Sequence, residues 1–366
     1  MAIKKIILLF VVSRLFFLFI AAVSHGFVQT DPGYLGQQVS QGEPSWVWTW
    51  ANMDGRHFIK IATLGYTGTN FIFFPLYPSL IGLVSFTSHL TPITSGIIIS
   101  ILSTILAVYY LLKLADLDKL KTSKFEVLFL LFFFPYGFIL NSVYSDGLFL
   151  FFTTTSLYYA RKGNWLLSGI SALLSSLTRL SGLSLLPILI FEWWAQRRKV
   201  GLRGLIAPTL NIVGFLGFAV YMQIVHGNWR LFQISMRAWN MEKTVLLPQV
   251  LYRYLHIFVS VSPKLIVYWI AALEFVVFIL SFVLALYVYR KIRASYGLFM
   301  MILLSLRTFN GTLAGTPRYL IHLFPVYLGL GLLLHNHPRL RFVYYPTTII
   351  LGILITSLFV QGYFVG

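Results

Sequence analysis

The chain carries a long apolar run near its start, IILLFVVSRLFFLFIAAVS at residues 6–24, in which Arg14 is the one charged residue. About 20 consecutive apolar residues form a helix long enough to cross the hydrocarbon core of a bilayer. Runs of this kind recur along all 366 residues, of which 58% are hydrophobic and only 10% are charged. A soluble core of this length does not need so much apolar sequence. The sequence therefore predicts an all-α polytopic membrane protein.

About eleven segments have the apolar character of a transmembrane helix. They are residues 6–24, 92–112, 125–141, 146–160, 165–180, 181–196, 205–225, 265–289, 296–308, 318–334 and 342–361. Lys4 and Lys5, ahead of the first segment, also resemble the start of a signal peptide. A chain that is embedded throughout favours a first span instead.

Basic residues give the chain a net charge of +18, and many of them lie in short loops between the apolar segments. Such loops stay on the cytoplasmic side, so the charge indicates topology rather than nucleic-acid binding. The basic loops are 4–5, 113–124, 161–162, 197–203, 290–293 and 339–341. They share the inner side if the apolar residues 71–87, which include Pro75 and Pro78, do not cross the membrane.

A long first loop, residues 25–91, then lies on the outer side. We expect two juxtamembrane helices in this loop, at about 52–64 and 72–87. No internal repeat or linker appears, so residues 1–366 are expected to form a single integral-membrane domain. The chain has no cysteine, which excludes disulfide bonds and thiolate metal sites.

Asp54 is the most informative acidic residue, because acidic side chains number only 10 in the whole chain. Asp54, Phe58 and Ile61 follow the spacing of one helix face. Asn52 is expected to cap this helix, which places Asp54 in the first turn, where the helix dipole favours an ionised carboxylate. Such a carboxylate can accept a proton from a hydroxyl nucleophile. A simple cap, or an ion pair with Arg56, is the alternative.

A second acidic residue, Asp146, lies in a polar turn between two apolar segments. It either orients an acceptor, supports His57 or Arg179, or caps the following helix. Six arginines also fall on the outer side: Arg179, Arg230, Arg237, Arg253, Arg307 and Arg318. Since positive charge is disfavoured there, we expect an anionic ligand, and the planar arginine fork suits phosphate. For Arg318, which opens an apolar segment, contact with lipid headgroups is the alternative.

The remaining polar residues within apolar segments carry weaker hypotheses. Arg14 and Glu274 are functional candidates by position, or they bind a partner inside the bundle. Glu126 and Glu192 lie near inner helix ends, and we expect structural roles for them. His322 is expected to be a buried core histidine rather than a ligand.

The first outer loop contains DGRHFxxIAxxGY at residues 54–66 and FFPLYP at 73–78. Together they resemble the first-loop signature of the GPI-anchor mannosyltransferase II (PIG-V-like) family. Three shorter segments agree in order and spacing: YSDGLF at 144–149, TRLSGL at 178–183 and PRYL at 317–320. The family belongs to the type C glycosyltransferases (GT-C). Two departures are Met53, where tryptophan is common, and Asp146, where eukaryotic members usually have glutamate.

The resemblance implies a GT-C-like bundle with a catalytic acid in the first outer loop. It also implies transfer of a hexose, with mannose favoured, from a polyprenyl-phosphate-linked donor to a lipid or glycan acceptor, with inversion. Asp54 then matches the general base. The predicted substrate-binding residues are His57, Asp146, Arg179, Arg237 and Arg318, with phosphate contact inferred for the arginines.

No cofactor is required by this interpretation, because arginines can stabilise a departing phosphate as a metal ion would. The compact loops favour a prokaryotic member in the cell membrane, with its active face outside the cytoplasm. Membrane lipids, the donor and the acceptor are the expected partners, and nucleic acid is not. A transporter or lipid flippase is the alternative, since Arg14 and Glu274 lie within apolar segments.

Overall fold

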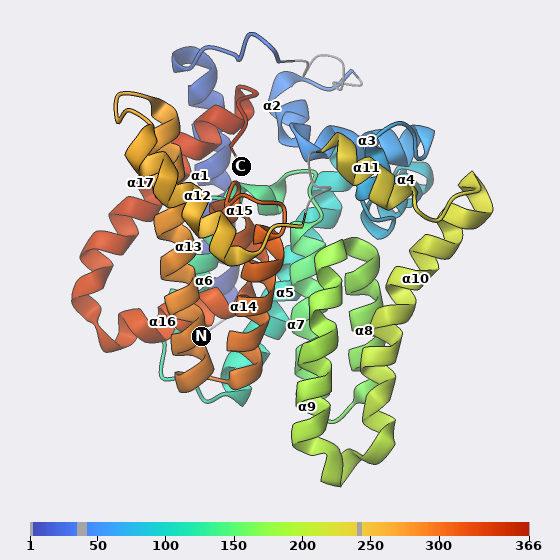
Figure 1. The fold of residues 1–366 in the computed structure, drawn as a ribbon. Coiled ribbons are helices and arrows are strands. Elements are labelled where there is room, and N and C mark those ends of the chain that lie inside the picture. The colour runs from blue at the N-terminus through green and yellow to red at the C-terminus, as the bar shows by residue number, and fades with distance from the viewer. Residues whose placement is uncertain (1–2, 35–41, 240–243, 366) are drawn as a thin grey trace.

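The computed structural model describes residues 3–34, 42–239 and 244–365, and all regular structure within them is helical (Figure 1). The α-helices are α1 (Ile3–Phe27), α2 (Ser45–Trp48), α3 (Asp54–Leu64), α4 (Leu76–Ser88), α5 (Pro92–Leu117), α6 (Lys124–Phe132), α7 (Asp146–Arg161), α8 (Trp165–Thr178), α9 (Leu185–Val200), α10 (Ile206–His226), α11 (Leu231–Ala238), α12 (Leu247–Ser260), α13 (Ile266–Lys291), α14 (Ala294–Thr308), α15 (Thr316–Tyr319), α16 (Phe324–Asn336) and α17 (Arg341–Val360). The prediction of an all-α polytopic membrane protein is confirmed.

Five helical segments of the described chain are long and apolar enough to cross a bilayer. They are Lys4–Phe27, Pro92–Leu117, Leu180–His226, Val267–Lys291 and Pro338–Val360. A sixth is formed by residues 316–322 together with 324–336, if this pair, bent by 92°, counts as one span. The predicted number of eleven is not confirmed, because several predicted spans are short helices. For example, α8 has 14 residues, or about 21 Å at 1.5 Å per residue.

One predicted span, residues 125–141, is interrupted. Helix α6 ends at Phe132, shortly before Pro135, and a short 3₁₀ helix follows at Gly137–Asn141. Non-helical backbone at membrane depth needs hydrogen-bond donors from the protein. The buried Arg14 supplies them: its Nη1 donates to the Gly137 carbonyl at 3.3 Å and also to the Asn141 side chain. Arg14 therefore has an interior partner.

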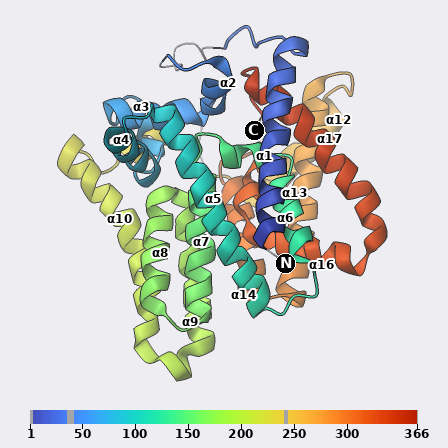
Figure 2. The ribbon, with the colours of Figure 1, turned by 180° about the vertical axis from the view of Figure 1, so that it is seen from behind.

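The long connection between α1 and α5 contains two helices close to the residues at which the sequence predicted them. The helix expected at about 52–64 corresponds to α3, which begins at Asp54, and the helix expected at about 72–87 corresponds to α4, which begins at Leu76. Helix α4 has 13 residues and is too short to cross a bilayer. Helices α3 and α4 lie at one end of the molecule, above α8 and α10 in both views (Figures 1 and 2), and α11 lies next to them in Figure 1.

The opposite end, at the bottom of Figure 1, holds the connections between α5 and α6, α9 and α10, and α13 and α14. Ion pairs join the helices there. Arg293 binds Glu192 through two hydrogen bonds of 2.6 Å, and Arg341 binds Glu126 at 2.8 and 3.0 Å. A third pair, Arg161 with Asp118, joins α7 to the end of α5. Glu126 and Glu192 therefore have the structural partners expected of them.

Candidate active site

Asp54 is the first residue of α3, and the backbone before it is unusual. Met53 has φ of 56°, which is rare for a residue with a side chain, and no side chain caps the helix. The predicted cap by Asn52 is wrong: its amide donates to the carbonyl of Phe359 at 2.8 Å instead. The placement of Asp54 in the first turn is confirmed. Its carboxylate thus lies at the positive end of the helix dipole.

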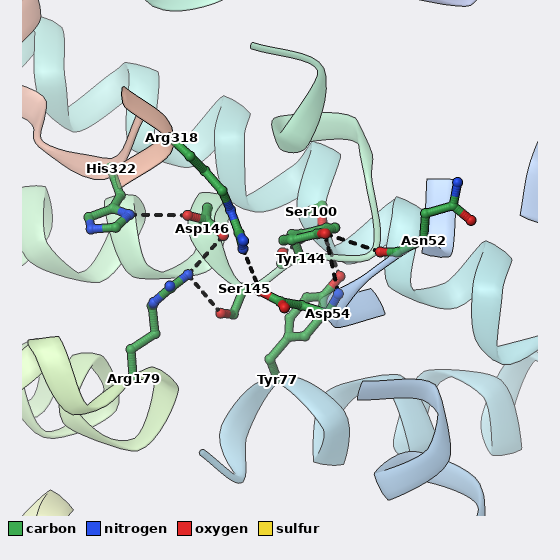
Figure 3. A network of polar contacts seen from close by, with 10 residues as sticks. All are labelled: Asn52, Asp54, Tyr77, Ser100, Tyr144, Ser145, Asp146, Arg179, Arg318 and His322. Carbon is green, nitrogen blue, oxygen red and sulfur yellow. Dashed lines mark hydrogen bonds and ion pairs between the residues drawn. The ribbon is translucent and has the colours of Figure 1, made fainter. Parts of the chain in front are cut away.

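Tyr144 fixes the start of α3 from the neighbouring loop. The Asp54 backbone N–H donates to the Tyr144 hydroxyl at 3.3 Å, and this hydroxyl donates to the Asn52 carbonyl at 3.0 Å. Arg318 approaches from α15, forms an ion pair with the Asp54 carboxylate and lies 4.9 Å from the centre of the Tyr144 ring (Figure 3). The sequence alternative of an Asp54–Arg56 pair is replaced by a partner 264 residues away.

Asp146 forms the second half of the same network. It is the first residue of α7, and its carboxylate is only 1% exposed. Arg179 donates to Oδ2 at 2.8 Å, and Nδ1 of His322 lies 3.1 Å from Oδ1. Arg318, the ion-pair partner of Asp54, is also near enough to Asp146 to interact with it electrostatically. The cluster therefore joins residues of α3, α7, α15 and η7 (Leu320–His322) with Arg179, which lies between α8 and η5 (Leu180–Ser184) (Figure 3).

A glycine follows each of these carboxylates and permits close packing. A Cβ on Gly55 would lie 3.2 Å from the carbonyl oxygen of Val143, and a Cβ on Gly147 would lie 2.9 Å from that of Ser100. A side chain at either position would push its helix away from the cluster. The two Asp-Gly pairs thus reflect the close approach of helix starts to neighbouring backbone.

A cavity of about 530 Å³ opens beside the cluster. Its polar lining includes Asp54, Arg179, Arg318 and His322. The rest is mostly apolar and comes from α11, η5 and α14, including Phe232, Met236, Leu180, Leu183, Leu303 and Leu304. Its size falls in the range of small-molecule and cofactor sites, and mixed linings of this kind are typical of them.

The side chain of Asp54 is more exposed than that of the arginine with which it pairs. The Asp54 side chain is 27% exposed, whereas that of its partner Arg318 is 8% exposed. The carboxylate is therefore accessible from the cavity, and the guanidinium is held largely behind it. Asp146 does not line the cavity, although Arg179 and His322, which it holds, both do.

His57 lies one helical turn after Asp54 but faces an aromatic group instead of the cavity. Its Nδ1 is 2.6 Å from Oδ1 of Asn70, and its ring stacks on Phe73 at 5.0 Å. The ring edge of Trp239 lies against it at 5.2 Å. Phe73 and Trp239 line the cavity, so His57 supports the wall from behind.

Arg237 is exposed on α11 and does not line this cavity. Its predicted role in substrate binding stays a prediction. Of the other arginines that the sequence predicted on the outer side, Arg253 donates to the Gly311 carbonyl at 3.1 Å, and the side chain of Arg307 lies outside the described part of the structure. Glu274 accepts a hydrogen bond of 2.6 Å from Tyr254, so it has a partner within the bundle.

His322 is the polar residue that sequence reasoning placed in the core and that the structure places at the cavity. It is 2% exposed, as a core histidine would be, but it binds Asp146 and belongs to the cavity lining. Its position four residues after Arg318, on the same helical face, was the available signal.

We expect the protonation of His57 to be coupled to stability. Burial lowers the pKa of His57, against the raising effect of Asn70 and Asp54. The unfolded chain binds a proton near pH 6.5, and the folded chain does so only at lower pH. The free energy of unfolding should therefore fall as pH drops below about 6.5, until the folded pKa is reached. Thermal unfolding in detergent from pH 7.5 to 5 measures this, and His57→Gln should flatten the curve. An unchanged slope in that variant would contradict the assignment.

Comparison with known proteins identifies the family. Residues 3–195 match the model of a family described as mannosyltransferase (PIG-V), which is more than half of the chain. No curated protein and no solved structure matches the chain. The matched region includes Asp54, His57, Asp146 and Arg179, whereas Arg318 lies beyond it and joins the cluster through the fold. This chain therefore belongs to the PIG-V family of mannosyltransferases and is a membrane glycosyltransferase.

Proposed function

We propose that the protein transfers mannose from a polyprenyl-phosphate-linked donor to a hydroxyl of a lipid or glycan acceptor, with inversion. We place the reaction on the extracytoplasmic side of the cell membrane, with Asp54 as the general base. The observation that carries the proposal is that one cavity is lined by a carboxylate, Asp54, and two guanidinium groups, Arg179 and Arg318.

Asp54 has the properties that a general base needs. Its carboxylate is accessible from the cavity, is fixed through the backbone by Tyr144, and lies at a helix start that favours the ionised form. A bound acceptor hydroxyl beside it would lose its proton to the carboxylate as the oxygen attacks the anomeric carbon of the sugar.

The two arginines suit the phosphate of the donor. Arg318 and Arg179 lie 5.9 and 5.8 Å from the centre of the Tyr319 ring, so the two guanidinium groups flank one side chain. Planar guanidinium groups bind phosphate oxygens through paired hydrogen bonds. The apolar side of the cavity, next to α11 and α14, would hold the first isoprene units of the lipid.

The Asp54–Arg318 ion pair would couple deprotonation of the acceptor hydroxyl to departure of the phosphate. As the bond between the acceptor oxygen and the anomeric carbon forms, the bond from that carbon to the phosphate oxygen breaks and its electrons stay on the phosphate. A phosphate monoester carries about −1.5 to −2 charges at pH 7, compared with one negative charge on the diester donor. Protonation of Asp54 removes the charge that Arg318 balances, so Arg318 becomes available to the phosphate as its new charge appears.

The location of the site supports an extracytoplasmic reaction. Residues of α3 and α11 line the cavity, and these two helices lie at the end of the molecule opposite the basic connections (Figure 1). Basic connections favour the cytoplasmic side. The chain has no cysteine, so Asp54→Cys would introduce a single thiol, and an impermeant maleimide added outside intact cells would react with it if this orientation is correct.

The function is tested with the purified protein in liposomes. Polyprenyl-phosphate-mannose is supplied with candidate acceptors, including glycolipids and lipid-linked glycans, and mannose transfer is scored by mass spectrometry. Appearance of a mannosylated acceptor supports the proposal. Movement of the donor across the bilayer without transfer would instead favour a flippase. No turnover with any polyprenyl-phosphate-hexose would overturn the proposed donor.

We expect transfer to persist in the presence of EDTA. Arg179 and Arg318 already place two positive charges at the cavity. Among residues 3–34, 42–239 and 244–365, no group of three or more His, Asp or Glu side chains is arranged to hold a metal ion. The measurement compares initial rates before and after chelation. If activity is lost and added Mg²⁺ or Mn²⁺ restores it, a metal ion stabilises the departing phosphate together with the arginines.

A further inference from the structure

His322 has a fixed orientation at the cavity. It lies in η7 (Leu320–His322), immediately before the bend that separates this segment from α16. The edges of Phe149 and Tyr319 pack against the imidazole at 5.1 and 5.6 Å. Nδ1 lies 3.1 Å from the Asp146 carboxylate (Figure 3). The ring is thus held by two aromatic side chains and one hydrogen bond.

The partner of Nδ1 determines what the other ring nitrogen can do. An ionised carboxylate only accepts hydrogen bonds, so Nδ1 carries a proton. In the neutral imidazole, Nε2 is then an acceptor with a free lone pair. Arg179 balances the charge of Asp146 at 2.8 Å, and Arg318 acts on the same carboxylate. The hydrogen bond between His322 and the Asp146 carboxylate therefore does not require a protonated imidazole.

An acceptor nitrogen at this place selects one kind of ligand group. A phosphate oxygen also carries lone pairs, so it is repelled by neutral Nε2 and favoured by the nearby guanidinium groups. A hydroxyl group can donate to Nε2. Among the chemical groups of a lipid-phosphate sugar, only the hydroxyls of the hexose are hydrogen-bond donors.

We propose that His322, oriented by Asp146, accepts a hydrogen bond from a hydroxyl group of the donor hexose and thereby contributes to sugar specificity. Asp146 acts through His322 and Arg179 as a positioning residue. This inference rests on the proposed function. In this arrangement the two guanidinium groups bind the phosphate, and the imidazole recognises the sugar.

The test uses a set of polyprenyl-phosphate-mannose donors in which each sugar hydroxyl in turn is replaced by hydrogen. We expect wild-type protein to use one of these deoxy donors with kcat/KM about 10- to 100-fold lower than the parent donor. We expect His322→Asn to remove this discrimination. The Asn amide can replace Nδ1 and retain the bond to Asp146, but it does not reach the position of Nε2. Gln reaches further, so His322→Gln should recover part of the discrimination.

His335→Gln is the matched control, because His335 is an exposed histidine at the far end of α16. It should discriminate among the deoxy donors as wild type does. Equal discrimination by wild type and His322→Asn against every deoxy donor would overturn the inference while leaving the transfer activity, and hence the proposed function, intact. A raised KM for all donors in His322→Asn, with no preference for one hydroxyl, would instead indicate contact with the phosphate and would also overturn it.

Discussion

Asp54→Asn should reduce the rate of mannose transfer by about 10²–10⁴-fold, which is the usual contribution of a general base. The amide has nearly the same shape as the carboxylate, and its oxygen can still accept a hydrogen bond from Arg318. It cannot take up a proton from the acceptor hydroxyl. The loss should therefore appear in kcat, with the KM for the donor little changed. The measurement is initial rates with the donor and acceptor identified in the transfer assay.

Asp31→Asn is a suitable control, because Asp31 lies in the same long connection between α1 and α5, and its Oδ1 accepts from the Gly33 N–H at 2.7 Å, which an amide oxygen can also do. Both variants should unfold at the temperature of the wild type. If Asp54→Asn transfers mannose at the normal rate, Asp54 is not the base. If it loses activity and also unfolds early, the Asp54→Glu variant separates a shift in geometry from a failure to fold.

Arg318→Gln is expected to lower kcat by about 10²–10³-fold, comparable to the loss of a preorganised donor at a developing charge. The variant removes the positive charge that the departing phosphate needs and leaves the Asp54 carboxylate without its ion-pair partner. Arg318→Lys keeps the charge but loses the planar fork, so it should retain more activity than Arg318→Gln. Arg339→Gln, at an exposed position among the basic residues of the other end, is the charge-matched control.

The double variant Asp54→Asn/Arg318→Gln tests whether the pair works as a unit. If Arg318 stabilises the phosphate only as Asp54 becomes protonated, the second substitution should cost much less than it does in the wild-type background. Fully multiplicative losses would mean that the two residues act independently. In that case Arg318 still binds phosphate, but the proposed exchange of its partner does not occur.

Much of the fold was readable from local sequence. The two prolines in residues 71–87 and the distribution of basic loops predicted that α4 does not span the membrane. The break after α6 was not predicted, because the apolar run at 125–141 has the composition of a span. What makes the break tolerable is Arg14, whose contacts with Asn141 and the Gly137 carbonyl join positions more than 120 residues apart. No local pattern encodes such a contact.

For the site, likewise, the residues could be predicted from local sequence, whereas their pairing could not. Asp54, Arg179 and Arg318 were identified by residue type and motif, and the fold brings them to one cavity. Their pairing was not predictable, since Arg56 is near Asp54 in sequence and Arg318 is not. His322 was assigned to the core because a lone histidine in an apolar run usually belongs there. Its partner Asp146 lies 176 residues earlier in the chain. Pro325, just after the bend, was a local signal that residues 318–334 are not a straight helix.

The ion pairs at the end remote from the cavity limit which helix movements can accompany catalysis. They tie α5 to α7, α9 to the start of α14, and α6 to α17. A carrier that opens to each side of the bilayer in turn would have to separate these helices, which would leave three nearly buried carboxylates without their partners in every cycle. Helices that remain joined at this end are consistent with a site that opens only at the opposite end of the molecule. We therefore expect substrates to enter and products to leave at the end that holds α3 and α11, so that no lipid chain has to pass through the protein.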